Sequence, residues 1–415
     1  MPHDGLYLDN FFELAFTLKP LLARWFCLAP VTRWGVPEQR AYGVTNKLYD
    51  GCLSRQPAFG STSQPATFAK HSGARGDEQR GPSMKSGVSR RIAWVVPGPG
   101  SVSLIADMCC RRAHADGADV RLLTLRPLRD PRFADAPYAL DCLGLSPPFE
   151  EVPERMLAWT LAQRRDVLML NSVEAAMPAI DSLPPSVKVF EVVHGMSPYQ
   201  LRGAARFEAA LDGVIAVSEA TARIVQARLR DASRVHVIYN GLSLPPRPDF
   251  DTDRTDVVFL GGDNSNKGAS DILSIWPAIA AEGFAGHLHW YGPIEPSFRR
   301  RIKSLPMQDR IVLHGPVAHG VVMEALSRAG ALIMASRSEA FGLVVVEAMA
   351  QGAIPVILDV PDNGVNEIVG SNYEFLCPPG RPKIFAQALL RACAADATVR
   401  RRLRAVVEAK FTDVT

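Results

Sequence analysis

Two glutamates, Glu339 and Glu347, stand eight positions apart in the stretch 338–352, SEAFGLVVVEAMAQG. The apolar runs 331–335 and 354–358 flank this stretch, and two buried strands around a helix-sized segment predict a βαβ unit of a parallel sheet. The exposed N–H groups and the dipole at the N-terminus of such a helix can bind an anion. Carboxylates beside an anion site accept hydrogen bonds from hydroxyl groups, so the pattern fits a ligand with both phosphates and hydroxyls, such as a nucleotide sugar.

The segment between the two strands has conflicting helix signals. Val344, Val345 and Val346 are β-branched and disfavour a helix, whereas the Glu-Ala-Met-Ala-Gln that follows favours one. Gly342 stands near the start and Gly352 just past the end, as glycines do at helix termini. We therefore predict a helix.

The whole string resembles the Glu-x7-Glu motif of the retaining glycosyltransferases of family 4, which have the two-domain GT-B fold. A bare Glu-x7-Glu is common on solvated helix faces, so the resemblance depends on the residues around it: Phe341-Gly342, Ala348-Met349-Ala350, Gly352 and Pro355-Val356. It covers about residues 89–411. It implies an α/β protein with two Rossmann-like domains facing each other across a donor-binding cleft, an acceptor-side domain over 89–245 and a nucleotide-sugar-binding domain over 246–415.

The resemblance also implies an activity and roles for residues. The activity is retaining transfer of a sugar from a nucleoside-diphosphate donor to an unidentified acceptor (a glycan, a lipid-linked molecule or a small molecule), as in polysaccharide biosynthesis. Glu339 would orient the transferred sugar and Glu347 would hold the ribose hydroxyls. The helix N-terminus at Phe341, Gly342 and Leu343 would stabilise the diphosphate leaving group, and such a design needs no metal and no cofactor.

The first domain contributes two candidates, Gly100 and His194. Gly100 ends a glycine turn after the strand 91–96, and Ser103 stands where a dinucleotide fingerprint needs a glycine. The family has a glycine-rich loop here that faces the donor, which implies a donor contact for Gly100. His194 follows the strand 187–193, at the strand edge where parallel sheets bind ligands. A lone histidine is more often structural, but the family places a His-Gly here whose imidazole contacts the donor sugar.

The second domain opens with the strand 257–260 and the loop Gly261-Gly-Asp-Asn-Ser-Asn-Lys267-Gly268. The lysine precedes its glycine, which argues against a Walker loop. Family members have Gly-Arg and, five residues later, Lys-Gly, and both cations meet the donor diphosphate. Lys267 fits this pattern, whereas Gly262 stands in place of the arginine. Loss of one charge-assisted phosphate contact costs roughly 1.5–3 kcal/mol, so we expect weaker donor binding or slower catalysis.

Composition narrows the function class. The chain has 415 residues, 47% of them hydrophobic, and a net charge of +3, too small to indicate a nucleic-acid partner. Its seven cysteines form no Cys-x-x-Cys, which argues for a reducing compartment and a cytoplasmic location. Asp249-x-Asp251 follows prolines within the predicted linker 244–254, so we assign these carboxylates to solvent and not to a metal.

Residues 1–88 differ from the rest of the chain. The stretch 54–87 has the composition of a disordered segment, and charges interrupt the apolar stretch 11–31, which excludes a membrane span and a standard secretory signal. An interfacial helix stays open, and with it peripheral contact with the inner face of a membrane. Because Met84 precedes the first strand closely, we expect residues 1–83 to be a mis-assigned start or a tail without a catalytic role.

Two other functions stay open. Gly262 and an end at Thr415, where family members continue with a helix that crosses back onto the first domain, favour a catalytically silent sugar-nucleotide-binding protein. A sugar-nucleotide epimerase of the same fold would need further acid and base carboxylates, which no motif places.

Overall fold

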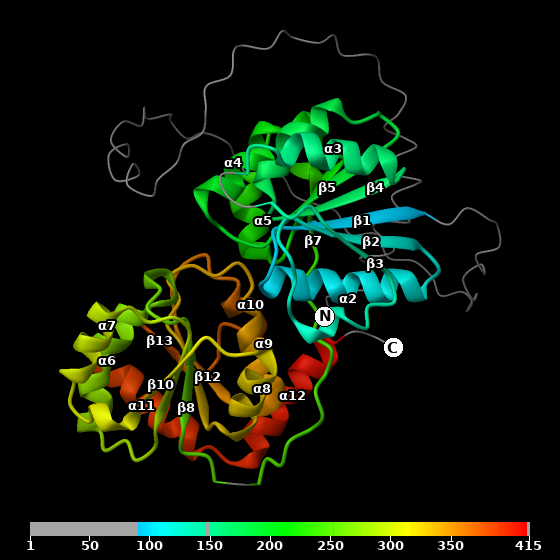
Figure 1. Ribbon diagram of the computed structural model, residues 1–415. Coiled ribbons are helices and arrows are strands. Elements are labelled where there is room, and N and C mark those ends of the chain that lie inside the picture. The colour runs from blue at the N-terminus through cyan, green and yellow to red at the C-terminus, as the bar shows by residue number, and fades with distance from the viewer. Residues whose placement is uncertain (1–89, 146–148, 252, 413–415) are drawn as a thin grey trace, which may run out of the picture. The chain divides into compact units, whose positions relative to one another are not determined.

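The computed structural model describes residues 90–145, 149–251 and 253–412, so the expectations for residues 1–88 lie outside it. The first domain is built on a seven-stranded parallel sheet with the strand order β3-β2-β1-β4-β5-β6-β7 (Figure 1). Its strands are β1 (Arg91–Val96), β2 (Asp119–Thr124), β3 (Ala139–Cys142), β4 (Val167–Asn171), β5 (Lys188–Val193), β6 (Gly213–Ala216) and β7 (Val235–Val237).

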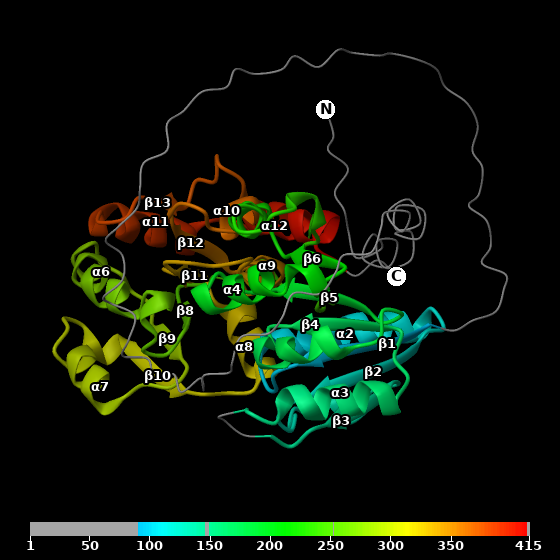
Figure 2. The ribbon, with the colours of Figure 1, turned by 90° about the horizontal axis from the view of Figure 1, so that it is seen from above.

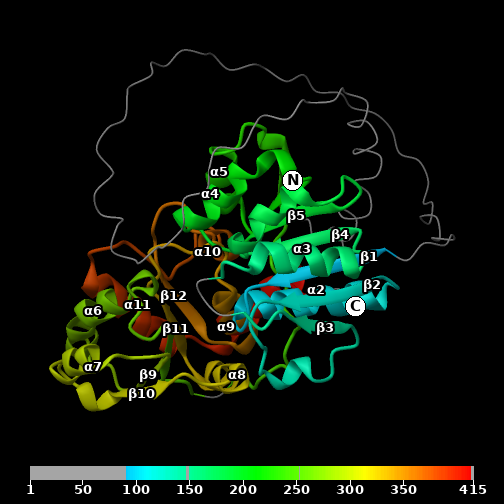
Figure 3. The same ribbon diagram turned by 45° about the horizontal axis from the view of Figure 1, so that its top comes forward.

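Helices cover both faces of this sheet, because successive side chains of a strand point to opposite faces. Trp94 of β1 lies in one apolar cluster with residues of α2 (Ser101–Ala115), whereas its neighbour Val95 lies in a second cluster with residues of α3 (Val152–Ala162). Figure 3 shows α2 and α3 on opposite sides of the strands. The remaining helices are α4 (Pro198–Arg206), α5 (Glu219–Gln226) and the 3₁₀ segments η1 (Pro131–Phe133), η2 (Glu174–Ser182), η3 (Glu208–Ala210) and η4 (Ala232–Arg234).

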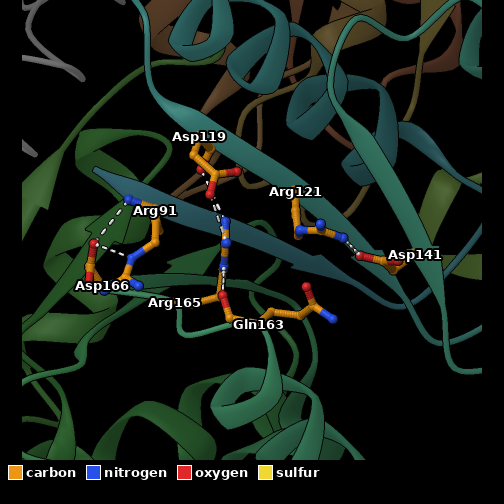
Figure 4. A network of polar contacts seen from close by, with 7 residues as sticks. All are labelled: Arg91, Asp119, Arg121, Asp141, Gln163, Arg165 and Asp166. Carbon is orange, nitrogen blue, oxygen red and sulfur yellow. Dashed lines mark hydrogen bonds and ion pairs between the residues drawn. The ribbon is translucent and has the colours of Figure 1, made fainter. Parts of the chain in front are cut away.

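Ion pairs tie together the first four strands of this sheet (Figure 4). Arg91, the first residue of β1, pairs with Asp166 just before β4 at 2.6 Å. Arg165 pairs with Asp119 at the start of β2 at 2.8 Å, and its buried guanidinium also donates to the carbonyl oxygen of Gln163. These contacts fix the chain entering β4, and therefore the position of the residues that follow that strand.

The second domain has a six-stranded parallel sheet with the order β10-β9-β8-β11-β12-β13. Its strands are β8 (Val257–Leu260), β9 (Leu288–Tyr291), β10 (Ile311–Gly315), β11 (Ala331–Met334), β12 (Ile354–Leu358) and β13 (Leu376–Cys377). Its helices are η5 (Ser265–Lys267), α6 (Ala269–Ala281), α7 (Pro296–Lys303), η6 (Gln308–Arg310), α8 (His319–Arg328), α9 (Leu343–Gln351), α10 (Val365–Val369), α11 (Pro382–Ala394) and α12 (Ala397–Lys410). Figure 2 shows α6 and α7 on one side of β8, β9 and β10, and α8 on the other.

The predicted βαβ unit is confirmed. β11 and β12 pair in parallel, with Ala331 opposite Ile354, and α9 connects them. Val345 and Val346 are fully buried, so tertiary packing compensates for the low helix propensity of the valines. Gly342 and Gly352 flank the helix with φ angles of 93° and 81°, in the left-handed region that glycine adopts at no steric cost.

Within the part of the chain that the structure describes, no helix is long and apolar enough to cross a membrane.

Candidate active site

Lys267 and Glu339 form an ion pair at the carboxyl edge of the second sheet. Lys267 ends the loop after β8 and Glu339 lies in the loop after β11, and these strands are neighbours. Their parallel pairing brings the two loops to the same edge, where Lys267 Nζ lies 2.7 Å from Glu339 Oε2. The lysine side chain is 40% exposed and the glutamate side chain 16% exposed, so a ligand in solvent can reach the pair. The structure therefore brings together two residues that the sequence motifs identified separately.

Backbone contacts hold these two loops in place. The side chain of Asn264 accepts hydrogen bonds from the backbone N–H groups of Asn266 and Lys267, which closes the turn before the lysine. The backbone N–H of Arg337 donates to the carbonyl oxygen of Asn266 at 2.9 Å and joins the loops. Gly268 lies so close to the other loop that a β-carbon there would overlap the carbonyl oxygen of Ala335. Only glycine permits this approach.

The glycine in place of the expected arginine is required by the local backbone. Gly262 has a φ angle of 55°, and a β-carbon there would overlap the carbonyl oxygen of Pro293. Its own carbonyl oxygen accepts a hydrogen bond of 2.8 Å from Trp290 Nε1, which fixes the turn from inside the core. The backbone at position 262 therefore does not accept the arginine side chain that the family has there.

The N-terminus of α9 is open. No side chain caps it, and the N–H of Val345 donates to the carbonyl oxygen of Gly342, so an anion can bind at the N–H groups before Val345. Phe341 is only 3% exposed, and the centroid of its ring lies 5.7 Å from that of the Phe411 ring. Its side chain therefore packs in the core. A contact that Phe341 makes with a ligand must therefore come from its backbone.

Glu347 is already paired within the protein. It lies in α9, is 6% exposed, and its Oε1 is 2.6 Å from Nε2 of His319, the first residue of α8. The sequence reasoning did not single out His319. Its position shortly after the end of β10, at the carboxyl edge of the same sheet, was the available signal.

Gly100 and His194 lie at the carboxyl edge of the first sheet. Gly100 is the N-cap of α2, with a φ angle of 151° and open space where a β-carbon would be. Ser103, which interrupts the fingerprint, donates to the carbonyl oxygen of Gly98 and closes the turn. His194 follows β5 and its Nε2 lies 3.1 Å from Oδ1 of Asn171, the last residue of β4. Burial lowers the pKa of His194 to about 4, so its ring is neutral at physiological pH.

A narrow, mainly apolar cavity lies beside His194. Residues of β1, α2, β4, β5, β6 and the segment after β7 line it: Trp94, Ile105, Met108, Cys109, Asn171, Val192, His194, Ile215, Val217, Ile238, Tyr239, Asn240 and Gly241. Asn171 was missed from the sequence, although a polar residue at the end of the apolar run VLML marks a strand's carboxyl end.

A buried acidic pair was also missed. Glu191 belongs to β5 and is 3% exposed. Its side chain and that of Glu174 in η2 both pack against α4. One oxygen of each carboxyl group, Oε2 of Glu191 and Oε1 of Glu174, has no hydrogen-bond partner. Burial, and then the charge of Glu174, raise the pKa of Glu191 to about 8. Burial also raises the pKa of Glu174.

The linker aspartates Asp249 and Asp251 have partners within the protein. Asp251 of the linker pairs with Arg401 at 2.6 Å, and Asp249 accepts a hydrogen bond from the backbone N–H of Asp251. Among residues 90–145, 149–251 and 253–412, no three histidine, cysteine, aspartate or glutamate side chains are grouped so that they could hold a metal ion.

Two family models match this chain over separate segments. The family described as Glycosyltransferase Family 4 matches residues 102–244, and the family described as Glycosyl transferases group 1 matches residues 254–395. An exopolysaccharide phosphotransferase of Streptomyces coelicolor is 27% identical over 248 residues, which are 57% of this chain and 26% of that protein. A GDP-mannose:cellobiosyl-diphosphopolyprenol alpha-mannosyltransferase of Xanthomonas oryzae is 27% identical over 154 residues, 36% of this chain and 40% of that protein. The chain thus matches less than half the length of these relatives.

Solved structures show the same architecture. Sucrose-phosphate synthase from Thermosynechococcus elongatus superimposes with a TM-score of 0.65 at 20% identity, over 78% of this chain and 95% of that one. At this identity the likeness concerns the fold alone. It confirms the prediction of an α/β protein with two Rossmann-like domains of the GT-B type.

Proposed function

Since this chain belongs to the glycosyltransferases of family 4 (glycosyl transferases group 1), we propose that it transfers a sugar from a nucleoside-diphosphate donor to an acceptor with retention of the anomeric configuration. The observation that carries the proposal is the pair of Lys267 and Glu339, 2.7 Å apart, in the domain where α9 presents an uncapped N-terminus. A cation and free N–H groups suit a diphosphate, and a carboxylate suits sugar hydroxyls.

The proposed reaction places most of the catalytic work at the leaving group. The bond between the anomeric carbon and the diphosphate oxygen breaks, and the nucleoside diphosphate leaves with the electron pair. A bond to an acceptor hydroxyl oxygen forms on the same face, and the hydroxyl proton passes to the departing diphosphate oxygen. Lys267 and the α9 N-terminus stabilise the negative charge that develops on the diphosphate. This assignment needs no metal ion or cofactor.

The bound donor gives both glutamates a new partner. When the diphosphate takes Lys267, Glu339 is released from its ion pair and can accept hydrogen bonds from the transferred sugar. Glu347, whose second oxygen is not used by His319, accepts hydrogen bonds from the ribose. His194 and Gly100 contact the donor from the first domain.

For the acceptor we propose a glycan or a lipid-linked sugar of polysaccharide biosynthesis. The support is the name of the mannosyltransferase relative, which specifies a diphosphopolyprenol-linked acceptor. A cytoplasmic location and contact with the inner face of a membrane belong to the same proposal.

A direct assay tests the proposal. The full chain is incubated with UDP-, GDP- and ADP-sugars, with and without oligosaccharide and polyprenol-diphosphate-linked acceptors, with EDTA in a parallel series. Acceptor-dependent release of nucleoside diphosphate that EDTA leaves unchanged, with an α-linked product from an α-linked donor by NMR, supports the proposal. Sugar interconversion without an acceptor would indicate an epimerase. Donor binding without turnover would indicate a silent sugar-nucleotide-binding protein, the function that Gly262 favours.

A further inference from the structure

The side-chain amide of Asn171 has a fixed orientation. Asn171 is 2% exposed, and its Nδ2 lies 2.8 Å from the carbonyl oxygen of Met169 and 3.4 Å from that of Val95. Carbonyl oxygens only accept hydrogen bonds, so the amide nitrogen must face them. The other end of the amide, Oδ1, therefore points at His194.

This orientation decides which nitrogen of His194 carries the hydrogen. Nε2 of His194 lies 3.1 Å from Oδ1 of Asn171, and an amide oxygen cannot donate. The hydrogen must therefore be on Nε2. Burial is the cause that lowers the pKa of His194, and no charged group contributes to the shift. The ring therefore carries this one hydrogen, and Nδ1 has a free lone pair. The titratable side chains that line the same cavity are Cys109 and Tyr239, a thiol and a phenol, which are normally uncharged at neutral pH.

We infer that Asn171 is a positioning residue that holds His194 in the neutral tautomer with its hydrogen on Nε2 and leaves Nδ1 to accept a hydrogen bond from a hydroxyl of the bound sugar. The second half of this inference rests on the proposed function, whereas the tautomer does not. Asn171 and His194 follow neighbouring strands, with Asn171 opposite Val192 in the sheet, so the pairing is built into the parallel register.

The role of Nδ1 follows from the same geometry. A ring with the other tautomer would present a donor to the sugar, and a doubly protonated ring would present a donor and a positive charge. Either change removes the acceptor for the hydroxyl's hydrogen, so that the ring could then bind the hydroxyl only by donating to its oxygen. Asn171 would thus act through His194, without itself touching the substrate.

Nitrogen NMR of the full chain tests the tautomer directly. The protein is labelled with ¹⁵N-histidine, and the His194 signals are assigned by their loss in His194→Gln. We expect a protonated Nε2 and an unprotonated Nδ1 throughout pH 5.5–8.5. A hydrogen on Nδ1, or a ring that becomes doubly protonated near its ordinary pKa of about 6.5, would overturn the inference.

Two substitutions test the consequence. Asn171→Asp offers a negative acceptor at the same place, which should favour the imidazolium and move the acidic limb of kcat/KM upward by at least about one pH unit. Asn171→Ala removes the acceptor and should lower kcat/KM by up to about a hundredfold without moving that limb. Circular dichroism and the His194 signals show that each variant is folded.

The outcomes separate the two parts of the inference. If Asn171→Asp lowers activity but leaves both the acidic limb and the His194 signals unchanged, Asn171 is only structural and the inference fails. If the His194 signals respond as expected but turnover of wild type and variants is equal, the tautomer stands. The contact of His194 with the sugar, and with it that part of the proposed function, is then wrong.

Discussion

Replacing Glu191 with glutamine should stabilise the protein, and more so at high pH. The Glu191 side chain lies inside β5 under α4 and faces Glu174, and no hydrogen bond is made by its Oε2. Burial and the neighbouring carboxyl group raise its pKa from 4.5 to about 8. Between these two pH values the folded protein holds a proton that the unfolded chain has released.

The size of the effect follows from the two pKa values. Stability falls with rising pH wherever the folded state binds more protons, so the cost of Glu191 is absent below about pH 4.5 and grows up to about pH 8. Each pH unit in this window is worth about 1.4 kcal/mol, which gives about 3 kcal/mol at pH 7. Glutamine has the same shape as the protonated acid and does not titrate, so the Glu191→Gln substitution should recover most of this amount.

Urea unfolding of wild type and Glu191→Gln at pH 5, 6.5 and 8 measures the effect. The difference in unfolding free energy should be below about 1 kcal/mol at pH 5 and should rise by about 3 kcal/mol by pH 8. Glu208→Gln is a matched control, because Glu208 is also buried in the first domain but accepts hydrogen bonds from the backbone N–H groups of Arg230 and Asp231. It should destabilise by about 1–3 kcal/mol. A Glu191→Gln variant that is less stable than wild type, or whose gain does not change with pH, would refute the reasoning.

Three predictions concern the donor site. Lys267→Met should weaken binding of UDP or GDP by about 1.5–3 kcal/mol in titration calorimetry, and equal affinity would place the diphosphate elsewhere. Gly262→Arg should lower the melting temperature without tightening nucleotide binding, because a side chain there overlaps Pro293; tighter binding at an unchanged melting temperature would contradict this. Glu339→Gln should reduce turnover without weakening the binding of nucleoside diphosphate. Glu347→Gln should weaken the binding of nucleoside diphosphate and of nucleotide sugar alike, by about 1–3 kcal/mol. If Glu339→Gln weakened the binding of both ligands equally, Glu339 would have a structural role.

The sequence predicted elements whose pattern is local. The strands 91–96, 257–260 and 354–358 were predicted with the bounds that the structure shows, since continuous apolar runs and neighbouring glycines or prolines mark them. α4 was not predicted, because PYQLRGAAR is short, begins with proline and contains a glycine.

The pairings within the site could not be predicted in the same way. Lys267 and Glu339 are 72 positions apart, and Asn171 and His194 are 23 apart, and only the order of strands in the sheet brings each pair together. The family motif identified Lys267, Glu339 and His194 as single residues. Their partners in the unliganded protein, and the steric reason for glycine at position 262, depend on the register of neighbouring strands and on turns that a sequence pattern does not specify.

Both glutamates of the motif have a partner before any ligand arrives, and this changes how their mutants must be interpreted. Glu339 is paired with Lys267 and Glu347 with His319, so each contact with a donor is measured against an existing ion pair or hydrogen bond. In the proposed function a bound donor replaces the partner of Glu339. The diphosphate binds Lys267, and the hydroxyl groups of the sugar bind the carboxylate of Glu339. The net gain is therefore smaller than the sum of the new contacts. For Glu347 the imidazole uses one oxygen and can stay in place, so the ribose adds to the existing contact. In the proposed function the two carboxylates thus differ in their protein partners as well as in their ligands: the diphosphate would release Glu339 from Lys267, whereas His319 holds Glu347 in position for the ribose.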